Sequence, residues 1–257
     1  MGEHAPTQVL AGKVALVTGG TRGLGREMVE AFADAGADVV ISSRKMDSCV
    51  EAADAVHERT GRRCVPYACH VGRWDEIPGL IEAAYENFGR LDIVVNNAGI
   101  SPLYPSLDAL SEELFDKTIG VNLKGPFRVC ALAGSRMAEG DGGSIINVSS
   151  IAAVRPTPRE LPYAAAKAGL DVLTTGFAMA YGPKVRVNTI MAGPFLTDIA
   201  RAWDMDSFNR HAANFPLRRA GQPSEIVGAA MYLASPASSY TTGAVITVDG
   251  GSSIARM

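Results

Sequence analysis

The sequence of 257 residues lacks long apolar runs and lacks an excess of charge of one sign. No run approaches the ~20 apolar residues that a membrane-spanning helix needs. The first residues contain no basic region followed by an apolar stretch, so we expect no secretory signal peptide and a soluble, cytoplasmic protein. The formal net charge is −3, which gives no electrostatic reason to expect a nucleic-acid partner.

Cysteine is scarce and is not arranged for metal binding or redox exchange. The four cysteines form no C-x-x-C pair, and no group of cysteines and histidines has the spacing of a zinc site. We therefore expect four reduced, mostly buried thiols and no bound metal.

Apolar runs that predict buried parallel strands alternate with segments whose apolar residues recur at helical spacing. The predicted strands are 14–17, 39–41, 64–68, 91–95, 144–148, 185–190 and 245–248. Helices are predicted between them, including a long one that starts near Ser111 as its N-cap and one over 163–181. This order predicts an α/β fold, a Rossmann-like doubly wound parallel sheet of about seven strands with helices on both faces.

We expect a flexible N-terminal arm over residues 1–10 and a single domain over 11–257. The segment 195–222 breaks the alternation, has no obvious place in the sheet, and is predicted to be a substrate loop. Its apolar residues either line a substrate pocket or pack on the core or on another subunit. They are Phe195, Leu196, Ile199, Trp203, Met205, Phe208 and Phe215.

A glycine-rich loop, Thr18–Gly25, joins the first strand to the first helix with the pattern T-G-x-x-x-G-x-G. Glycine permits the tight turn and lets a pyrophosphate approach the backbone, while the helix N-terminus attracts its charge. The alternative is a glycine-rich turn that binds no ligand. The candidate cofactor contacts are Gly19, Thr21, Arg22, Gly23, Leu24 and Gly25.

The second strand ends in Ser42-Ser43-Arg44-Lys45 instead of the acidic residue that holds the ribose 2′-hydroxyl of NAD. A carboxylate there would repel a 2′-phosphate, whereas Arg44, with Arg22 as a second candidate, would attract it. Ser43 and Arg44 therefore favour NADP(H), with NAD(H) possible. The alternative is that both arginines are solvated loop residues.

Tyr163 and Lys167 lie four residues apart and share one face of a predicted helix. A nearby cation stabilises a phenolate, which makes tyrosine usable as a general acid or base. Ser150 ends the strand before this helix, at the sheet edge where ligands bind in parallel sheets. Alone, the Tyr-Lys spacing is weak, because any surface helix can carry it.

Together these motifs resemble the short-chain dehydrogenase/reductase family over about residues 11–251. The resemblance rests on the loop 18–25, Asn96-Asn97-Ala98-Gly99, Asn122, Ser150, Tyr163 with Lys167, and the segment 193–197.

The resemblance implies that Tyr163 is the general acid/base. Lys167 would lower its pKa and bind the nicotinamide ribose, Ser150 would orient the substrate oxygen, and Asn122 would hold a water in a proton relay. The alternatives are that Asn122 is a buried asparagine bonded to backbone and that Asn96 and Asn97 are turn residues. The cofactor contacts implied are Asn96, Asn97, Ala98, Gly99, Val71, Tyr163, Lys167, Gly193, Pro194 and Thr197. The family also implies a homotetramer, with the final strand at a subunit contact.

Two departures from the family pattern concern the cofactor pocket. His70-Val71 stands where the family often has Asp-Val, whose aspartate meets the adenine. Ala192-Gly193 replaces the family's Pro-Gly, with Pro194 next.

Three segments should surround the nicotinamide, namely 100–104, 151–161 and 195–215. Arg155 and Arg159 could meet an anionic substrate tail but are more often solvated. We expect an NADPH-dependent ketone or 3-oxoacyl reductase acting on a small-molecule carbonyl or alcohol. The alternatives are a dehydrogenase of small polar alcohols and a non-catalytic nucleotide-binding regulator.

Overall fold

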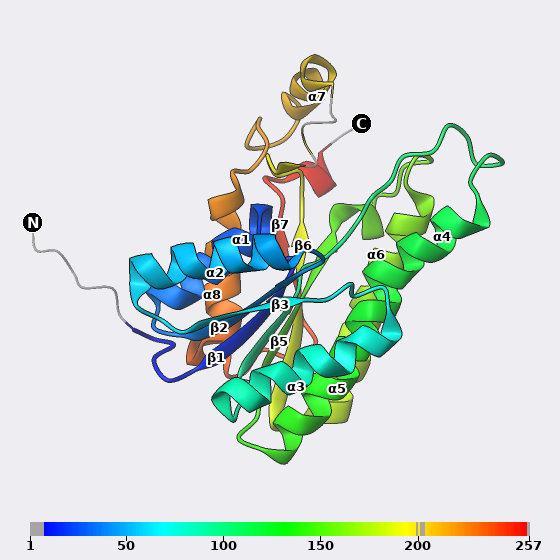
Figure 1. Cartoon of the computed structure of the whole chain (residues 1–257). Coiled ribbons are helices and arrows are strands. Elements are labelled where there is room, and N and C mark those ends of the chain that lie inside the picture. The colour runs from blue at the N-terminus through cyan, green and yellow to red at the C-terminus, as the bar shows by residue number, and fades with distance from the viewer. Residues whose placement is uncertain (1–7, 199, 201–203, 256–257) are drawn as a thin grey trace, which may run out of the picture.

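The computed structural model describes residues 8–198, 200 and 204–255, and within them seven parallel strands form one sheet (Figure 1). Their order is β3-β2-β1-β4-β5-β6-β7. The strands are β1 Val14–Thr18, β2 Asp38–Ser43, β3 Cys64–Ala68, β4 Ile93–Asn96, β5 Gly143–Ser150, β6 Val185–Ala192 and β7 Val245–Val248. The prediction of a doubly wound parallel sheet is confirmed.

Helices cover both faces of the sheet (Figure 1). α1, α2 and α8 pack on one face, and α3, α5 and α6 pack on the other. The helices are α1 Gly23–Asp34, α2 Met46–Thr60, α3 Ile77–Phe88, α4 Glu112–Ile119, α5 Gly125–Glu139, α6 Leu161–Tyr181, α7 Met205–Ala212 and α8 Val227–Ala234.

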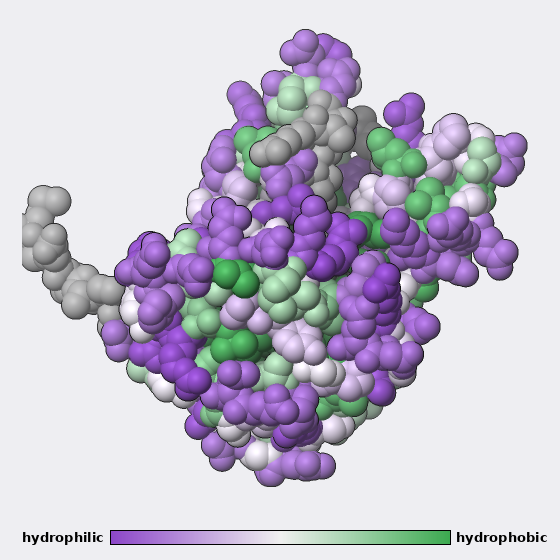
Figure 2. All heavy atoms as spheres, in the orientation of Figure 1, coloured by the Kyte–Doolittle hydropathy of each residue, from purple (hydrophilic) through white to green (hydrophobic). Residues whose placement is uncertain are grey.

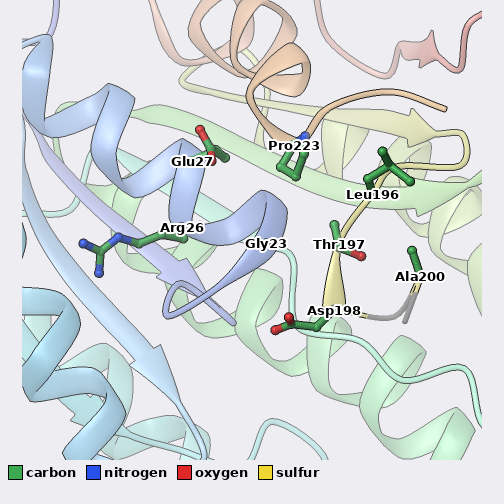
Figure 3. Close-up of a pocket in the computed structure, with 8 residues that line it drawn as sticks. All are labelled: Gly23, Arg26, Glu27, Leu196, Thr197, Asp198, Ala200 and Pro223. Carbon is green, nitrogen blue, oxygen red and sulfur yellow. The ribbon is translucent and has the colours of Figure 1, made fainter. Parts of the chain in front are cut away.

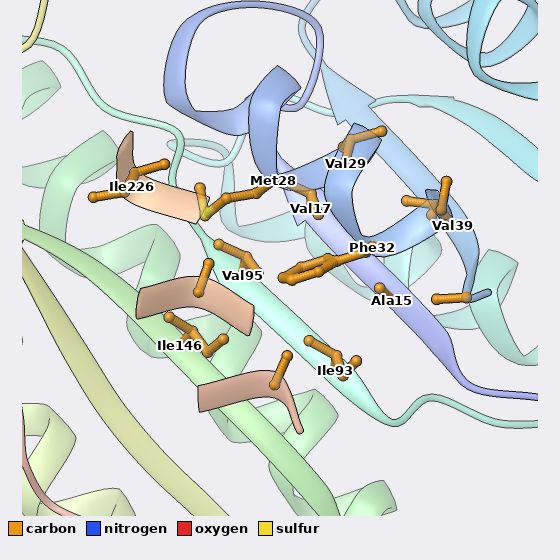
Figure 4. Packing of buried hydrophobic residues seen from close by; sticks show 14 of the residues in the cluster. Ala15, Val17, Met28, Val29, Phe32, Val39, Ile93, Val95, Ile146 and Ile226 are labelled. Atoms are coloured by element: carbon orange, nitrogen blue, oxygen red, sulfur yellow. The ribbon is translucent and has the colours of Figure 1, made fainter. Parts of the chain in front are cut away.

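The strands are apolar throughout because neighbouring residues feed two separate cores. In β1, Ala15 and Val17 join the core under α1, α2 and α8, while Val14 and Leu16 join the opposite one. Figure 4 shows the first core, where Phe32 of α1 packs among side chains of β1 and β4. Leu10, which the sequence assigned to the N-terminal arm, is only 1% exposed and belongs to this core.

The predicted long helix after Ser111 is divided into three parts. The Ser111 hydroxyl accepts a hydrogen bond from the Leu114 amide at 3.2 Å, so the predicted N-cap is confirmed. Between α4 and α5, residues 120–124 form a π-helical turn that contains Asn122. Single π turns inside helices are frequent at functional sites.

The segment 195–222 stands above the carboxyl end of the sheet, with α7 at its top (Figure 1). A bridge between Phe195 and Gly221 closes its base. Phe195 and Phe215 are buried, whereas Leu196 and Met205 are exposed, so its apolar residues divide between core packing and the surface. Ile199 and Trp203 lie outside the described residues.

Hydrophilic residues dominate the face in Figure 2, with small apolar areas between them. No helix among the described residues is long and apolar enough to cross a membrane. The four cysteines are free thiols, and three of them are buried. Burial raises the pKa of Cys64 to about 11 and that of Cys130 to about 12, so neither is a reactive thiolate at neutral pH.

Candidate active site

The glycine-rich loop is built so that side chains would obstruct it. Gly19 and Gly23 have φ of 66° and 53°, in the left-handed region that favours glycine. A Cβ on Gly25 would lie 2.2 Å from the Gly19 carbonyl oxygen and 2.5 Å from Nδ2 of Asn97. Glycine at position 25 therefore lets the loop and Asn97 pack directly against the N-terminus of α1.

Hydrogen bonds from β1 and from the segment after β4 fix this loop. The Thr18 hydroxyl donates to the Val95 carbonyl and accepts from the amides of Asn97 and Ala98. Nδ2 of Asn97 donates to the carbonyls of Thr18 and Gly19 at 3.0 and 3.2 Å. The predicted residues Gly19, Asn97 and Ala98 are thus brought together. Asn96 instead turns into the core, where Nδ2 donates to Oδ1 of Asn147 at 2.9 Å.

A cavity of about 440 Å³ opens between the start of α1 and the segment after β6 (Figure 3). Gly23 faces Thr197 across it, and a Cβ on Gly23 would lie 3.3 Å from the Thr197 methyl group. Thr21 is half-buried and Leu24 packs against the core under α1. Residues from distant parts of the sequence therefore line one cavity. The cavity is lined by Gly23, Arg26, Glu27, Leu196, Thr197, Asp198, Ala200 and Pro223.

The residues after β2 lie at the same edge of the sheet. Ser43 is half-buried and its hydroxyl is 3.3 Å from Sγ of Cys49, while Arg44 is exposed. Nη1 of Arg22 lies 3.5 Å from Oδ2 of Asp198 in an exposed ion pair. Arg22 therefore connects the glycine-rich loop to the segment after β6.

His70 and Val71 form the turn after β3. Nδ1 of His70 accepts from the Gly72 amide at 3.1 Å, and its backbone amide donates to Oε2 of Glu76 at 2.7 Å. The imidazole of His70 thus stabilises the turn over residues 70–72. Val71 is buried at the packing contact with Gly125.

The segment after β6 is held from both sides. The Gly193 amide donates to the Val248 carbonyl, and the Pro194 carbonyl accepts from the Gly221 amide, both at 2.9 Å. The path of the chain through Ala192-Gly193-Pro194 is therefore fixed by β7 and by the end of the substrate loop.

Ser150, Tyr163 and Lys167 converge at the end of β5. The Ser150 hydroxyl accepts from the Ala152 amide, and α6 begins at Leu161 with Pro162 in its first turn, which favours helix initiation there. Ser150 lies near enough to the Tyr163 hydroxyl to affect the pKa of the phenol. Nζ of Lys167 lies 5.7 Å from the centre of the Tyr163 ring. The predicted trio is one cluster.

Burial determines the protonation of this cluster. It raises the pKa of Tyr163, while the Ser150 hydroxyl opposes the rise, so the phenol is protonated at neutral pH. Lys167 is 3% exposed, and burial lowers its pKa to about 8. Its Nζ donates to the Val148 carbonyl at 2.7 Å.

Asn122 is fully buried in the π turn, where its side chain connects to the loop after β4. Its Nδ2 donates to the carbonyls of Ile100 and Thr118, and Oδ1 accepts from the Ile100 amide at 3.1 Å. A Cβ on Gly99 would lie 2.9 Å from Oδ1, so glycine is needed for this approach. These backbone bonds agree with the alternative interpretation of Asn122, and its part in a proton relay stays a prediction.

The structure adds two functional candidates that the sequence analysis did not name, Tyr104 and Asp171, and gives Arg155 a different role from the predicted one. Tyr104 joins two loops beside Tyr163: its hydroxyl donates to the Pro158 carbonyl and accepts from the Leu161 amide. Arg155 donates to the carbonyls of Ser253 and Ala255, both at 2.7 Å. It therefore attaches the loop between β5 and α6 to the C-terminal segment. Asp171 follows Lys167 by one helical turn, a spacing that the sequence does display.

Known proteins are similar to this chain in sequence and fold. The family model described as enoyl-(acyl carrier protein) reductase matches residues 19–253. A 3-oxoacyl-(acyl-carrier-protein) reductase of Chlamydia trachomatis is 36% identical over 244 residues, 95% of this chain and 98% of that protein. A protein of Sinorhizobium meliloti described as a short-chain alcohol dehydrogenase superposes with a TM-score of 0.92 at 38% identity, over 98% of this chain and 100% of its own. An NADPH-dependent 3-quinuclidinone reductase of Rhodotorula rubra has a TM-score of 0.89 at 31% identity, over 98% and 96% of the two chains.

Proposed function

The chain belongs to the short-chain dehydrogenase/reductase family, and we propose that it is an NADPH-dependent reductase of ketones or 3-oxoacyl thioesters. Members of this family are NAD(P)-dependent oxidoreductases that act on CH–OH and C=O groups. Tyr163 is the general acid of this chain. The observation that carries this assignment is the cluster of Ser150, Tyr163 and Lys167 beside the glycine-rich loop.

A bound nicotinamide would supply the hydride that reduces the carbonyl carbon. Ser150 donates a hydrogen bond to the carbonyl oxygen and orients it. Tyr163, protonated at neutral pH because it is buried, gives its proton to that oxygen as negative charge develops. The ammonium of Lys167 stabilises the phenolate that remains. Asn122 is proposed to hold a water through which Tyr163 is reprotonated.

The cofactor is proposed to be held by residues from several loops. They are the glycine-rich loop, Val71, Asn97, Ala98, Gly99, Gly193, Pro194 and Thr197. NADP(H) is favoured over NAD(H) because Arg44 is exposed at the end of β2, where no carboxylate opposes a 2′-phosphate. The 3-quinuclidinone reductase that this chain resembles is NADPH-dependent.

The surroundings of the site support a carbonyl substrate with an apolar tail. Leu103, Val154 and Leu196, from three segments predicted to surround the nicotinamide, are exposed. A dehydrogenase of small polar alcohols would gain little from such residues. The structure ties Arg155 to the C-terminal segment, so of the two predicted arginines only Arg159 is available for an anionic tail.

We also propose that the protein is a cytoplasmic homotetramer with no nucleic-acid or membrane partner. Val172 and Met179 of α6 and Val245 of the edge strand β7 are exposed apolar residues suited to contacts between copies. Sedimentation equilibrium at micromolar concentration tests this, and a monomer would refute it.

The decisive variant is Tyr163→Phe, which removes only the transferable proton. We expect it to fold, to bind NADPH, and to lose turnover by roughly 100- to 10,000-fold. NADPH consumption with a panel of ketones and a 3-oxoacyl thioester measures kcat, and cofactor fluorescence measures binding. A variant that binds cofactor and keeps most of its kcat would exclude Tyr163 as the acid.

A further inference from the structure

The ammonium group of Lys167 is buried, and no opposite charge forms an ion pair with it among the described residues. Its side chain is 3% exposed, and its Nζ donates to a neutral acceptor, the Val148 carbonyl. A buried ammonium without an opposite charge tends to lose its proton. Because the proposed mechanism needs a cation beside Tyr163, something must hold Lys167 in its charged form.

Asp171 lies one turn further along α6, on the same helical face as Lys167. Its Oδ1 is buried and has no hydrogen-bond partner among the described residues. The hydroxyl of Ser149, the neighbour of Ser150 at the end of β5, donates to the Lys167 carbonyl oxygen at 3.3 Å. It also lies near enough to the Asp171 carboxyl group to lower the pKa of that group. Asp171 is therefore half-buried, with one carboxylate oxygen shielded from solvent.

The other charged groups on elements packed against α6 are engaged elsewhere or face solvent. Arg128 and Lys124 lie 4.5 and 5.7 Å from the centre of the Trp74 ring. Arg186 of β6 donates to Ser238 and to the carbonyls of Leu233 and Ser235. The charged residues of α4, Glu112, Glu113, Asp116 and Lys117, are exposed. Glu160, ahead of α6, acts on Tyr163.

We propose that Asp171 is a positioning residue that keeps Lys167 protonated over the working pH range of the enzyme. The proposal rests on the roles proposed above for Tyr163 and Lys167. Burial and the opposite charge act against each other at both residues: burial lowers the pKa of Lys167 and raises that of Asp171, while each charge moves the pKa of the other back. Removing the carboxylate therefore leaves only the effect of burial on the lysine.

The test is the pH profile of kcat for carbonyl reduction with saturating NADPH in the wild type, Asp171→Asn and Asp171→Glu. Loss of the Lys167 proton limits the rate on the alkaline side. Asp171→Asn should move this alkaline limb to lower pH by about one unit, as expected for losing a nearby opposite charge. Asp171→Glu should keep the limb near its wild-type position. Asp116→Asn, the same change at an exposed residue of α4, is the matched control and should leave the profile unchanged.

An alkaline limb that does not move in Asp171→Asn, or a kcat that falls by one factor at every pH, would overturn the proposal. Ser149→Ala provides a second measurement if Asp171→Asn fails to fold. It keeps the carboxyl group but removes the neighbouring hydroxyl that lowers the pKa of Asp171, and should shift the limb in the same direction by less. An unshifted limb in Ser149→Ala would then overturn the proposal. Tyr163→Phe and Lys167→Ala separate the two hypotheses: if both lose activity while Asp171→Asn keeps the wild-type profile, only the role of Asp171 fails.

Discussion

The glycine-rich loop and the Ser150–Lys167 cluster lie at the same edge of the sheet, yet they treat their polar groups in opposite ways. In the loop, Thr18 and Asn97 each make several hydrogen bonds to backbone. In the cluster, Lys167 is buried against a single carbonyl, and Oδ1 of Asp171 has no hydrogen-bond partner among the described residues. The loop is held rigidly by satisfied hydrogen bonds. The cluster instead keeps a buried lysine whose pKa is lowered, and shifted pKa values of this kind are frequent at functional sites.

The largest expected effect separates the two regions through the pH dependence of stability. The folded-state pKa of Lys167, about 8, lies below its ordinary value of 10.5, so the unfolded chain binds the proton more tightly. The free energy of unfolding of the wild type should therefore rise from pH 8 to pH 10.5, by roughly 3 kcal/mol from this residue. Lys167→Met should lack this rise.

Urea unfolding of the cofactor-free wild type and Lys167→Met across that window measures the difference. Groups that titrate in both proteins cancel. If the free energies of unfolding of the two proteins change with pH in parallel, the pKa of Lys167 is not lowered in the folded state. The contrast with the glycine-rich loop would then be lost.

A smaller effect tests the rigidity of the loop. The methyl group of Gly25→Ala would meet the Gly19 carbonyl oxygen and the Asn97 amide, neither of which can move without breaking the hydrogen bonds described above. We expect a loss of about 1–3 kcal/mol in stability and a severe loss of NADPH binding. Gly228→Ala, at an open and exposed position of α8, is the matched control and should raise stability by roughly 0.5–1 kcal/mol. Equal binding by Gly25→Ala and wild type would show that the loop yields to an added methyl group.

The smallest effect concerns the choice between cofactors. A charge-assisted hydrogen bond contributes roughly 1.5–3 kcal/mol, so Arg44→Ala should lower kcat/KM for NADPH by about 10- to 100-fold and leave NADH nearly unchanged. Ser43→Asp should reverse the preference, because the new carboxylate accepts from a 2′-hydroxyl and repels a phosphate. Steady-state kinetics with both cofactors checks this. A wild type that prefers NADH, or equal losses for both cofactors, would show Arg44 to be only a surface residue.

The sequence predicted the sheet and the positions of the motifs because both follow from local patterns. Apolar runs such as Val14–Val17 indicate strands, and the glycines at 19, 23 and 25 indicate a phosphate-binding turn. The π turn at Asn122 could not be predicted, since hydrophobic spacing does not distinguish it from a continuous helix. The role of Arg155 was equally hidden, because it depends on carbonyl groups about 100 residues later in the chain.

The attachment made by Arg155 has an evolutionary consequence. It holds the loop leading to Tyr163 through the carbonyls of Ser253 and Ala255, and a carbonyl group is present whatever residue occupies the position. Side chains between them, such as the exposed Ile254, can therefore be replaced without releasing the loop. Mutations can therefore change the side chains of the C-terminal segment while the loop before Tyr163 keeps its position. We expect substrate specificity to be able to change in this way without displacing Ser150, Tyr163 and Lys167.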